Sequence, residues 1–172
     1  MKKNLQKYSV LAVVSLFFLA ATSAFAGTQT SNMSVSATVS ANCTISAGAL
    51  DFGAYDPVVA NASNPLPGTA TITVTCTNGS PATLTLDQGL HPAGGSTNAA
   101  PLRQMANGGS LMSYDLFQDN AMTVPWGNTA GTGVGYTGTG TSGSVTVYGQ
   151  VAGAQNVPAG TYNDTVVATI TF

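Results

Sequence analysis

Two cysteines, Cys43 and Cys76, carry the clearest chemistry in the sequence, because they are its only thiols. Each has the same parity as the alternating apolar residues around it, so both side chains are expected to point into one core. An even number of cysteines in an oxidising compartment predicts a disulfide between them. A zinc site would need further ligands, and no cluster of histidines accompanies the two thiols.

Residues for enzymatic catalysis are nearly absent. His91 is the only histidine, and it stands in a turn beside Pro92. A catalytic triad built on it would need a presented nucleophile, but the chain has no Gly-x-Ser-x-Gly motif. The six aspartates stand mostly at strand ends and turns, where this residue type caps backbone donors. The sequence therefore predicts no catalytic residue, no cofactor and no small-molecule substrate.

Metal and phosphate sites are not expected either. Asp115 and Asp119 stand four residues apart, but the stretch around them lacks the oxygen-ligand spacing of a calcium-binding loop. The glycines of residues 135–143 have neither a lysine nor a following helix, so they do not fit a phosphate-binding loop.

The first 26 residues have the composition of a signal peptide. Three lysines precede an apolar run, and Ala24 and Ala26 supply the small residues that signal peptidase recognises. The run is too short to span a bilayer, which needs roughly 20 residues. The sequence therefore predicts that residues 27–172 are exported.

The charge of the exported part limits its partners. Arg103 is its only Lys or Arg, against six Asp and no Glu. Nucleic-acid binding depends on Lys and Arg that neutralise phosphates, and attraction to an anionic membrane surface depends on the same residues. We therefore expect no nucleic-acid partner.

Short runs of alternating apolar and polar residues are the main structural signal. They predict strands at residues 33–45, 50–57, 69–76, 82–89, 110–119, 144–151 and 162–172, with a short edge strand near 102–105. Turn residues separate the runs, and the Gly- and Thr-rich residues 126–143 are expected to form a surface loop. About seven short strands with turns between them predict an all-β sandwich.

The last run raises a question of pairing. Val166, Ala168, Ile170 and Phe172 share one parity, which predicts a strand with one face in the core. Nothing follows Phe172 in the sequence. If this strand lies at a sheet edge, its backbone groups are expected to need a partner from elsewhere.

Several stretches together resemble the spore coat protein U domain family, which includes the major subunits of archaic chaperone–usher pili. They are the alternating strand that runs into Cys43, "LDFGAY" (50–55), "ITVTCTNG" (72–79), "LTLDQG" (84–89), "LRQM" (102–105), "SYDLFQD" (113–119), "VYGQV" (147–151) and "GTYNDTVVATITF" (160–172). The resemblance covers nearly the whole exported chain and rests on the order and spacing of these stretches.

The resemblance implies an incomplete immunoglobulin-like β-sandwich that lacks its last strand and is completed by a donor strand from another chain. In such families a periplasmic chaperone lends a strand to the open groove. An outer-membrane usher then lets the N-terminal extension of the next subunit replace it. The implied partners are this chaperone, the usher, and other copies of the chain or sister subunits. The implied location is the periplasm and then the cell surface.

On this interpretation residues 27–40 are the donor extension and residues 41–172 the subunit domain. The donor side chains are Met33, Val35, Ala37 and Val39, which alternate as a strand lent to another sheet requires. The acceptor groove edge is formed by Val166, Ala168, Ile170 and Phe172. The same extension could instead be the chain's own first strand, and the boundary between the two roles stays open.

The predicted function is therefore a structural subunit of a surface pilus that supports adhesion and biofilm formation. The alternative is a secreted or tip-located adhesin, or a coat protein that does not polymerise. For a lectin, Trp126, Tyr136 and Tyr148 could form a sugar-binding platform. Such aromatic residues more often seal the edge of a sandwich core.

Overall fold

The computed structural model describes residues 25–172. The predicted signal peptide, residues 1–26, lies outside the described residues except for its last two. The chain divides after Ala37 into two units, each taken here by itself. In the first unit, residues 25–37 form no helix or strand, and all their side chains are exposed. The second unit, residues 38–172, contains every strand of the described chain.

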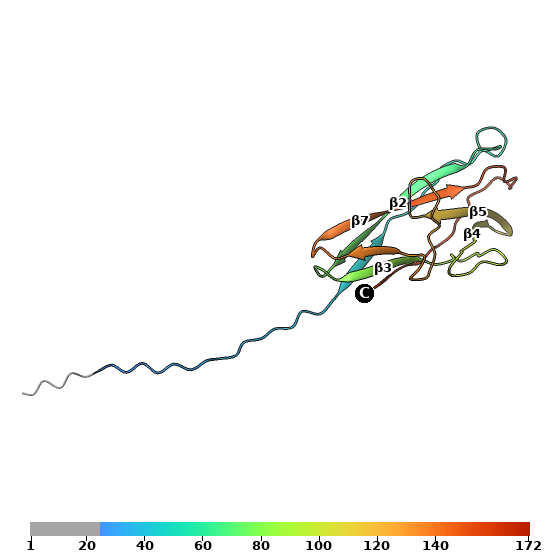
Figure 1. Ribbon diagram of the computed structural model, residues 1–172. Helices are drawn as coiled ribbons and strands as arrows, with labels where there is room; N and C mark the ends of the chain where they lie inside the picture. Colours follow the sequence, from blue (N-terminus) through green and yellow to red (C-terminus); the bar gives the residue numbers. More distant parts are fainter. Residues whose placement is uncertain (1–24) are drawn as a thin grey trace, which may run out of the picture. The chain divides into compact units, whose positions relative to one another are not determined.

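The second unit is an all-β fold of two antiparallel sheets (Figure 1). Its eight strands are β1 (Cys43–Ala47), β2 (Leu66–Cys76), β3 (Pro81–Leu86), β4 (Arg103–Asn107), β5 (Ser110–Phe117), β6 (Val134–Thr137), β7 (Ser142–Val151) and β8 (Ala168–Thr171). The larger sheet has the order β1-β2-β7-β5-β4, and the smaller sheet has the order β6-β3-β8. No helix among residues 25–172 is long and apolar enough to cross a membrane.

The alternation seen in the sequence places the core between the sheets. On β2, Ile72, Val74 and Cys76 are buried, while the threonines between them face outward. Buried residues of β3, β5 and β7 join them in one cluster, which includes Leu84, Leu116 and Val147. The period of two therefore gives each sheet one apolar and one polar face, and the two apolar faces pack together.

The disulfide predicted between the two cysteines is present. Cys43 and Cys76 are register partners on neighbouring strands, with an S–S distance of 2.04 Å. Cys43 is the first residue of β1, and Cys76 is the last residue of β2. The bond therefore joins the start of the edge strand β1 to the end of its only strand partner in the described chain.

One predicted strand is absent, two are shorter than the alternation suggested, and one strand was missed. Residues 50–57 form no strand. The strand predicted at residues 33–45 begins only at Cys43, and the last run is paired only at Ala168–Thr171. The unpaired parts have no neighbouring strand in the described chain to complete a ladder. The predicted surface loop, residues 126–143, contains β6, which adds a short edge to β3.

Candidate functional site

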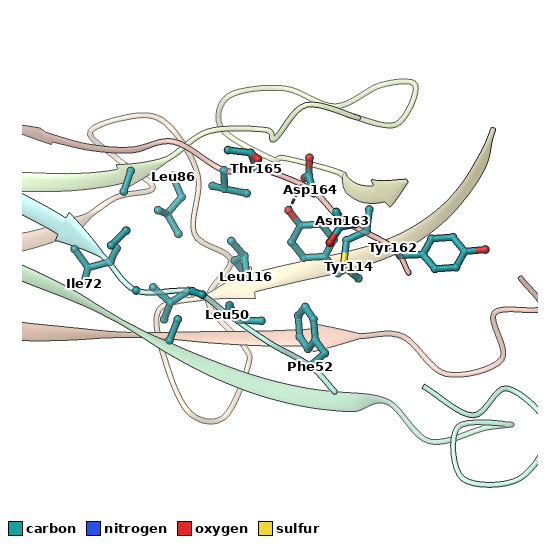
Figure 2. Close-up of a pocket in the computed structure, with 18 residues that line it drawn as sticks. Leu50, Phe52, Ile72, Leu86, Tyr114, Leu116, Tyr162, Asn163, Asp164 and Thr165 are labelled. Atoms are coloured by element: carbon teal, nitrogen blue, oxygen red, sulfur yellow. Dashed lines mark hydrogen bonds between the residues drawn. The ribbon is translucent and has the colours of Figure 1, made fainter. Parts of the chain in front are cut away.

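An apolar groove opens where the two sheets end. β1 is the edge of the larger sheet and β8 is the edge of the smaller one, and among residues 25–172 no strand pairs with the second side of either. A cavity of about 470 Å³ lies there (Figure 2). Its lining is Ala47, Gly48, Ala49, Leu50, Phe52, Ala70, Ile72, Leu86, Met105, Tyr114, Leu116, Val147, Tyr162, Asn163, Asp164, Thr165, Val166 and Ala168.

Two segments outside the strands form the walls of this groove. Residues 48–56 follow β1, and residues 158–167 precede β8. Both walls continue into a second cavity of about 770 Å³, which shares Leu50, Phe52 and Tyr162 with the first. Side chains of the second wall alternate between half-buried and exposed from Tyr162 to Ile170, as in a strand. The groove is thus bordered by backbone that is arranged like a strand but has no strand partner over much of its length.

Phe52 holds the first wall against β2 and β7 of the larger sheet, which form the floor of the groove. Its ring packs over Gly68 on β2 and Gly149 on β7, which are register partners. A Cβ atom on either glycine would lie 2.9 Å from the nearest ring carbon of Phe52. The ring also meets Tyr114 edge-on, with 6.1 Å between the two ring centroids. Two facing glycines therefore provide the space in which the first wall lies.

The second wall changes sheets along its length. Asn163 forms an antiparallel bridge with Ala106 on β4 of the larger sheet, with N···O distances of 2.9 and 3.0 Å. Five residues later the chain pairs with β3 of the smaller sheet, where Ala168 lies opposite Leu86. The wall therefore crosses the open side of the sandwich between two anchored ends.

One polar pair lies among the apolar side chains of the groove. The hydroxyl of Tyr114 donates a hydrogen bond to Oδ2 of Asp164 at 2.6 Å (Figure 2). The N–H of Leu90 donates to Oδ1 of the same carboxylate at 2.9 Å. Burial, followed by the hydrogen bond to Asp164, raises the pKa of Tyr114 above its usual range. The tyrosine therefore stays protonated and remains a donor to the carboxylate.

The single arginine is structural and lines neither of the two cavities. Arg103 is 2 % exposed, and its guanidinium donates to the carbonyls of Leu86, Asp87 and Trp126 at 2.7–3.0 Å. Burial lowers the pKa of Arg103 from its usual value. Because β4 belongs to the larger sheet and Leu86 to the smaller one, this side chain joins the two sheets.

Of the four residues predicted to form the groove edge, two line the first cavity and two do not. Val166 and Ala168 line the first cavity, whereas Ile170 is half-buried opposite Leu84, and Phe172 is 53 % exposed. Leu50, Phe52 and Tyr114, which line the groove, were not among the predicted site residues. The alternation of "LDFGAY" was a signal for the first two, but the fold was needed to bring that stretch opposite residues 162–168.

The predicted donor side chains are exposed. Met33, Val35 and Val39 are 84 %, 85 % and 81 % exposed, and Ala37 is exposed as well. Three large apolar side chains and one alanine are thus exposed on one parity, a pattern that is common in segments that bind another protein.

His91, Asp119 and Trp126, which were considered for catalysis, metal binding and sugar binding, lie in loops or in the core. His91 is exposed in its loop, and no group of three or more His, Cys, Asp or Glu in the described chain is placed to hold a metal. Asp119 accepts hydrogen bonds from Thr123 and Val124 within its own loop. Trp126 is fully buried, with its indole N–H donating to the carbonyl of Leu84 at 3.0 Å. It therefore seals the core and cannot form a surface platform for a sugar.

Comparison with known proteins gives both sequence and structural relatives. Residues 29–169 match the family described as the Spore Coat Protein U domain. Protein U of Myxococcus xanthus is 50 % identical over 178 residues, which cover 98 % of this chain and 99 % of that protein.

Two solved structures share the fold. One is the CsuC–CsuE chaperone–tip adhesion subunit pre-assembly complex from the archaic chaperone–usher Csu pili of Acinetobacter baumannii, with a TM-score of 0.56 and 23 % identity. That match covers 78 % of this chain and 40 % of the other. The P pilus rod subunit PapA gives a TM-score of 0.54 and 16 % identity, over 75 % of this chain and 97 % of that one. At these identities the likeness shows the fold, which is that of pilus subunits.

Proposed function

The chain belongs to the Spore Coat Protein U domain family, and from this membership we propose that it is a structural subunit of a surface pilus assembled by donor-strand exchange. Residues 1–26 direct export to the periplasm, residues 27–40 are the donor extension, and residues 41–172 are the accepting domain. The assembled subunits lie on the cell surface, where they support adhesion and biofilm formation.

The observation that carries the proposal is the unpaired groove between the two sheets. Residues 48–56, and residues 158–167 apart from the bridge at Asn163, border it without a strand partner in the described chain, and most of the residues that line it are apolar. An extended segment from another chain can bind there through backbone hydrogen bonds, with alternate side chains entering the groove. Such a strand would complete the sandwich.

The N-terminal extension has the pattern that this site requires. Met33, Val35, Ala37 and Val39 alternate with polar residues and are exposed in the described chain. Burying these four side chains in the groove of a second copy contributes on the order of 4–8 kcal/mol. On the accepting copy, Val166 and Ala168 contact the inserted strand, while Ile170 and Phe172 border it toward the C-terminus.

The proposed partners follow from the open groove. Before assembly, a periplasmic chaperone covers it with a strand of its own, and an outer-membrane usher exchanges that strand for the extension of the next subunit. A structure of a chaperone–subunit pre-assembly complex with the same fold supports the chaperone step. Other copies of this chain or sister subunits provide the exchanged strands.

Deleting the extension tests the proposal. Full-length protein should give ladders of oligomers on mildly denaturing gels, whereas protein lacking residues 27–39 should stay monomeric and unstable. A matched pair of variants sharpens the test: Val35→Ser removes a side chain that enters the groove, and Ser36→Ala changes one that points away. Ladders that survive Val35→Ser as well as Ser36→Ala would contradict the proposal.

A fusion tests the accepting groove separately. The extension joined by a short flexible linker after Phe172 should insert into the chain's own groove and raise the melting temperature. A fused segment with serine in place of Met33, Val35 and Val39 is the control. Equal melting temperatures for the two fusions would mean that the groove does not take this strand.

A coat protein that does not polymerise is the second candidate. It is favoured by the description of the family and by the near full-length likeness to Protein U. A stable full-length monomer without ladders, together with binding to a surface or a glycan array, would favour this function over the pilus.

A further inference from the structure

Two aspartates tie the second wall of the groove to the loop that follows β3. Oδ1 of Asp87, just after β3, accepts the N–H of Val167 at 2.9 Å. Oδ1 of Asp164, in the wall, accepts the N–H of Leu90 at 2.9 Å. Each carboxylate therefore binds the backbone of the segment that carries the other, and we refer to these two contacts as the reciprocal clamp.

The loop is shaped to fit this clamp. Gly89 has a φ of +74°, and a Cβ atom there would collide with the carboxylate of Asp164. The N–H of Gly89 donates to Oδ1 of Asp87 at 2.9 Å, which orients that carboxylate toward Val167. The N–H of Asp87 also donates to the carbonyl of Val167 at 3.1 Å. Each side chain of the clamp is thus held in position by a second contact.

Tyr114, which lines the groove, also holds the side chain of Asp164 in place. The second oxygen of Asp164 accepts the hydroxyl of Tyr114, whose ring is buried on β5. Arg103 donates to the carbonyl of Asp87 at 2.7 Å and fixes the start of the loop. A buried side chain therefore supports each end of the reciprocal clamp: Tyr114 at Asp164 and Arg103 at Asp87.

The clamp acts where strand pairing is missing. Between the bridge at Asn163 and the backbone hydrogen bond of Val167 with Asp87, residues 164–166 have no strand partner in the described chain, yet Val166 lines the cavity. Loops without such pairing normally sample many conformations, and an incoming strand must then order them. A wall that is already extended lowers this cost.

We propose that Asp87 and Asp164 are positioning residues that hold the accepting wall of the groove extended before the incoming strand binds. The inference rests on the proposed function, because it assigns these residues to the capture step of strand exchange. Removing either carboxylate leaves the wall free to leave the extended state, so the fraction of subunits ready to capture a strand falls. The capture rate falls in proportion to that fraction.

The capture rate is measured on the full chain with an extension that cannot donate. Val35→Ser and Val39→Ser remove two large donor side chains, and a fluorescent synthetic peptide of residues 29–41 is the probe. Trp126 is the only tryptophan and is fully buried, so its emission reports whether each variant is folded. In this background, Asp87→Ala and Asp164→Ala should each slow peptide association about tenfold, since a charge-assisted hydrogen bond is lost.

The matched variants separate positioning from general stability. Asp164→Asn keeps an oxygen that can accept the Leu90 N–H, so it should recover much of the rate. Asp119→Ala removes a carboxylate that caps a loop and does not line the groove, so it should leave the rate unchanged. Association at the parent rate in both clamp variants, with only a lower melting temperature, would overturn the inference.

These experiments distinguish a failure of the clamp inference from a failure of the proposed function. If the peptide fails to bind a folded chain with an intact clamp, the proposed function itself is wrong. If the altered extension prevents folding, ladder formation by the full chain with its native extension gives the rate instead. There, slower ladders in Asp87→Ala and Asp164→Ala than in Asp119→Ala support the clamp, and equal rates overturn it.

Discussion

Arg103 and Trp126 join the two sheets through consecutive hydrogen bonds. The guanidinium of Arg103 donates to the carbonyl of Trp126 at 2.8 Å, and the indole of Trp126 donates to the carbonyl of Leu84 at 3.0 Å. Both side chains are buried. The charge of Arg103 is thus held in the core by three backbone carbonyls, those of Leu86, Asp87 and Trp126.

Replacing Arg103 is expected to be strongly destabilising. Arg103→Met keeps the volume but leaves the buried carbonyls of Leu86, Asp87 and Trp126 without this donor. Several unsatisfied groups of this kind should lower the free energy of unfolding by about 3–5 kcal/mol. Urea unfolding followed by Trp126 fluorescence measures the change. Leu102→Ala, at a side chain 45 % exposed, is the control and should cost less than about 1 kcal/mol.

Removing the disulfide should destabilise the domain through the unfolded state. Cys43 and Cys76 close a loop with a sequence separation of 33. The chain-entropy treatment gives a loss of about 3.7 kcal/mol when that loop is opened. Unfolding in urea with and without a reducing agent measures it. In the double variant Cys43→Ser and Cys76→Ser, the reducing agent should have no effect, and an effect there would point to another cause.

The sequence predicted the parts of the fold that depend on local alternation. The strands around Val74, Leu84 and Val147, and the disulfide, follow from parity, because a half-buried strand needs an apolar residue at every second position. The same rule placed Val166 and Ala168 on the face that lines the groove.

The groove itself required tertiary information. Residues 50–57 alternate like a strand, but a strand forms only where a second backbone is available, and the described chain provides none there. Leu90 and Asp164 are far apart in sequence, so their contact has no local signal. β6 was missed because glycine and threonine dominate the stretch around Val134, and such composition is typical of loops.

Acid should destabilise the domain through two loop carboxylates. The N–H groups of Val58 and Val59 lower the pKa of Asp56, and the Val124 N–H and the side chain of Thr123 lower that of Asp119. A folded-state pKa below the unfolded value of about 3.9 gives stability that is present above that value. This stability is lost as the pH falls through the folded-state pKa.

The melting temperature should therefore be nearly constant around neutral pH and fall below about pH 4. Asp56→Asn together with Asp119→Asn should make that fall shallower, because neither side chain then titrates. Thermal unfolding between about pH 2 and pH 7, followed by Trp126 fluorescence, measures both curves. Identical acid slopes for the parent and the double variant would show that these two carboxylates do not contribute.

The glycine pair under Phe52 allows the most direct test of how the groove wall is held. A Cβ atom at Gly149 would lie 2.8 Å from Cδ1 of Leu50 and 2.9 Å from Cζ of Phe52. Gly149→Ala should therefore push this wall away from the floor and lower the free energy of unfolding by about 1–3 kcal/mol. Thermal and urea unfolding measure the change.

Two further variants decide whether the clash with Phe52 is the cause. Gly135→Ala places a Cβ on β6 with nothing within 4 Å, so it should be neutral or slightly stabilising. Phe52→Leu shortens the ring side chain and should recover part of the loss when combined with Gly149→Ala, because the two residues share a contact. Additive effects of Phe52→Leu and Gly149→Ala would mean that the wall is not positioned by this contact.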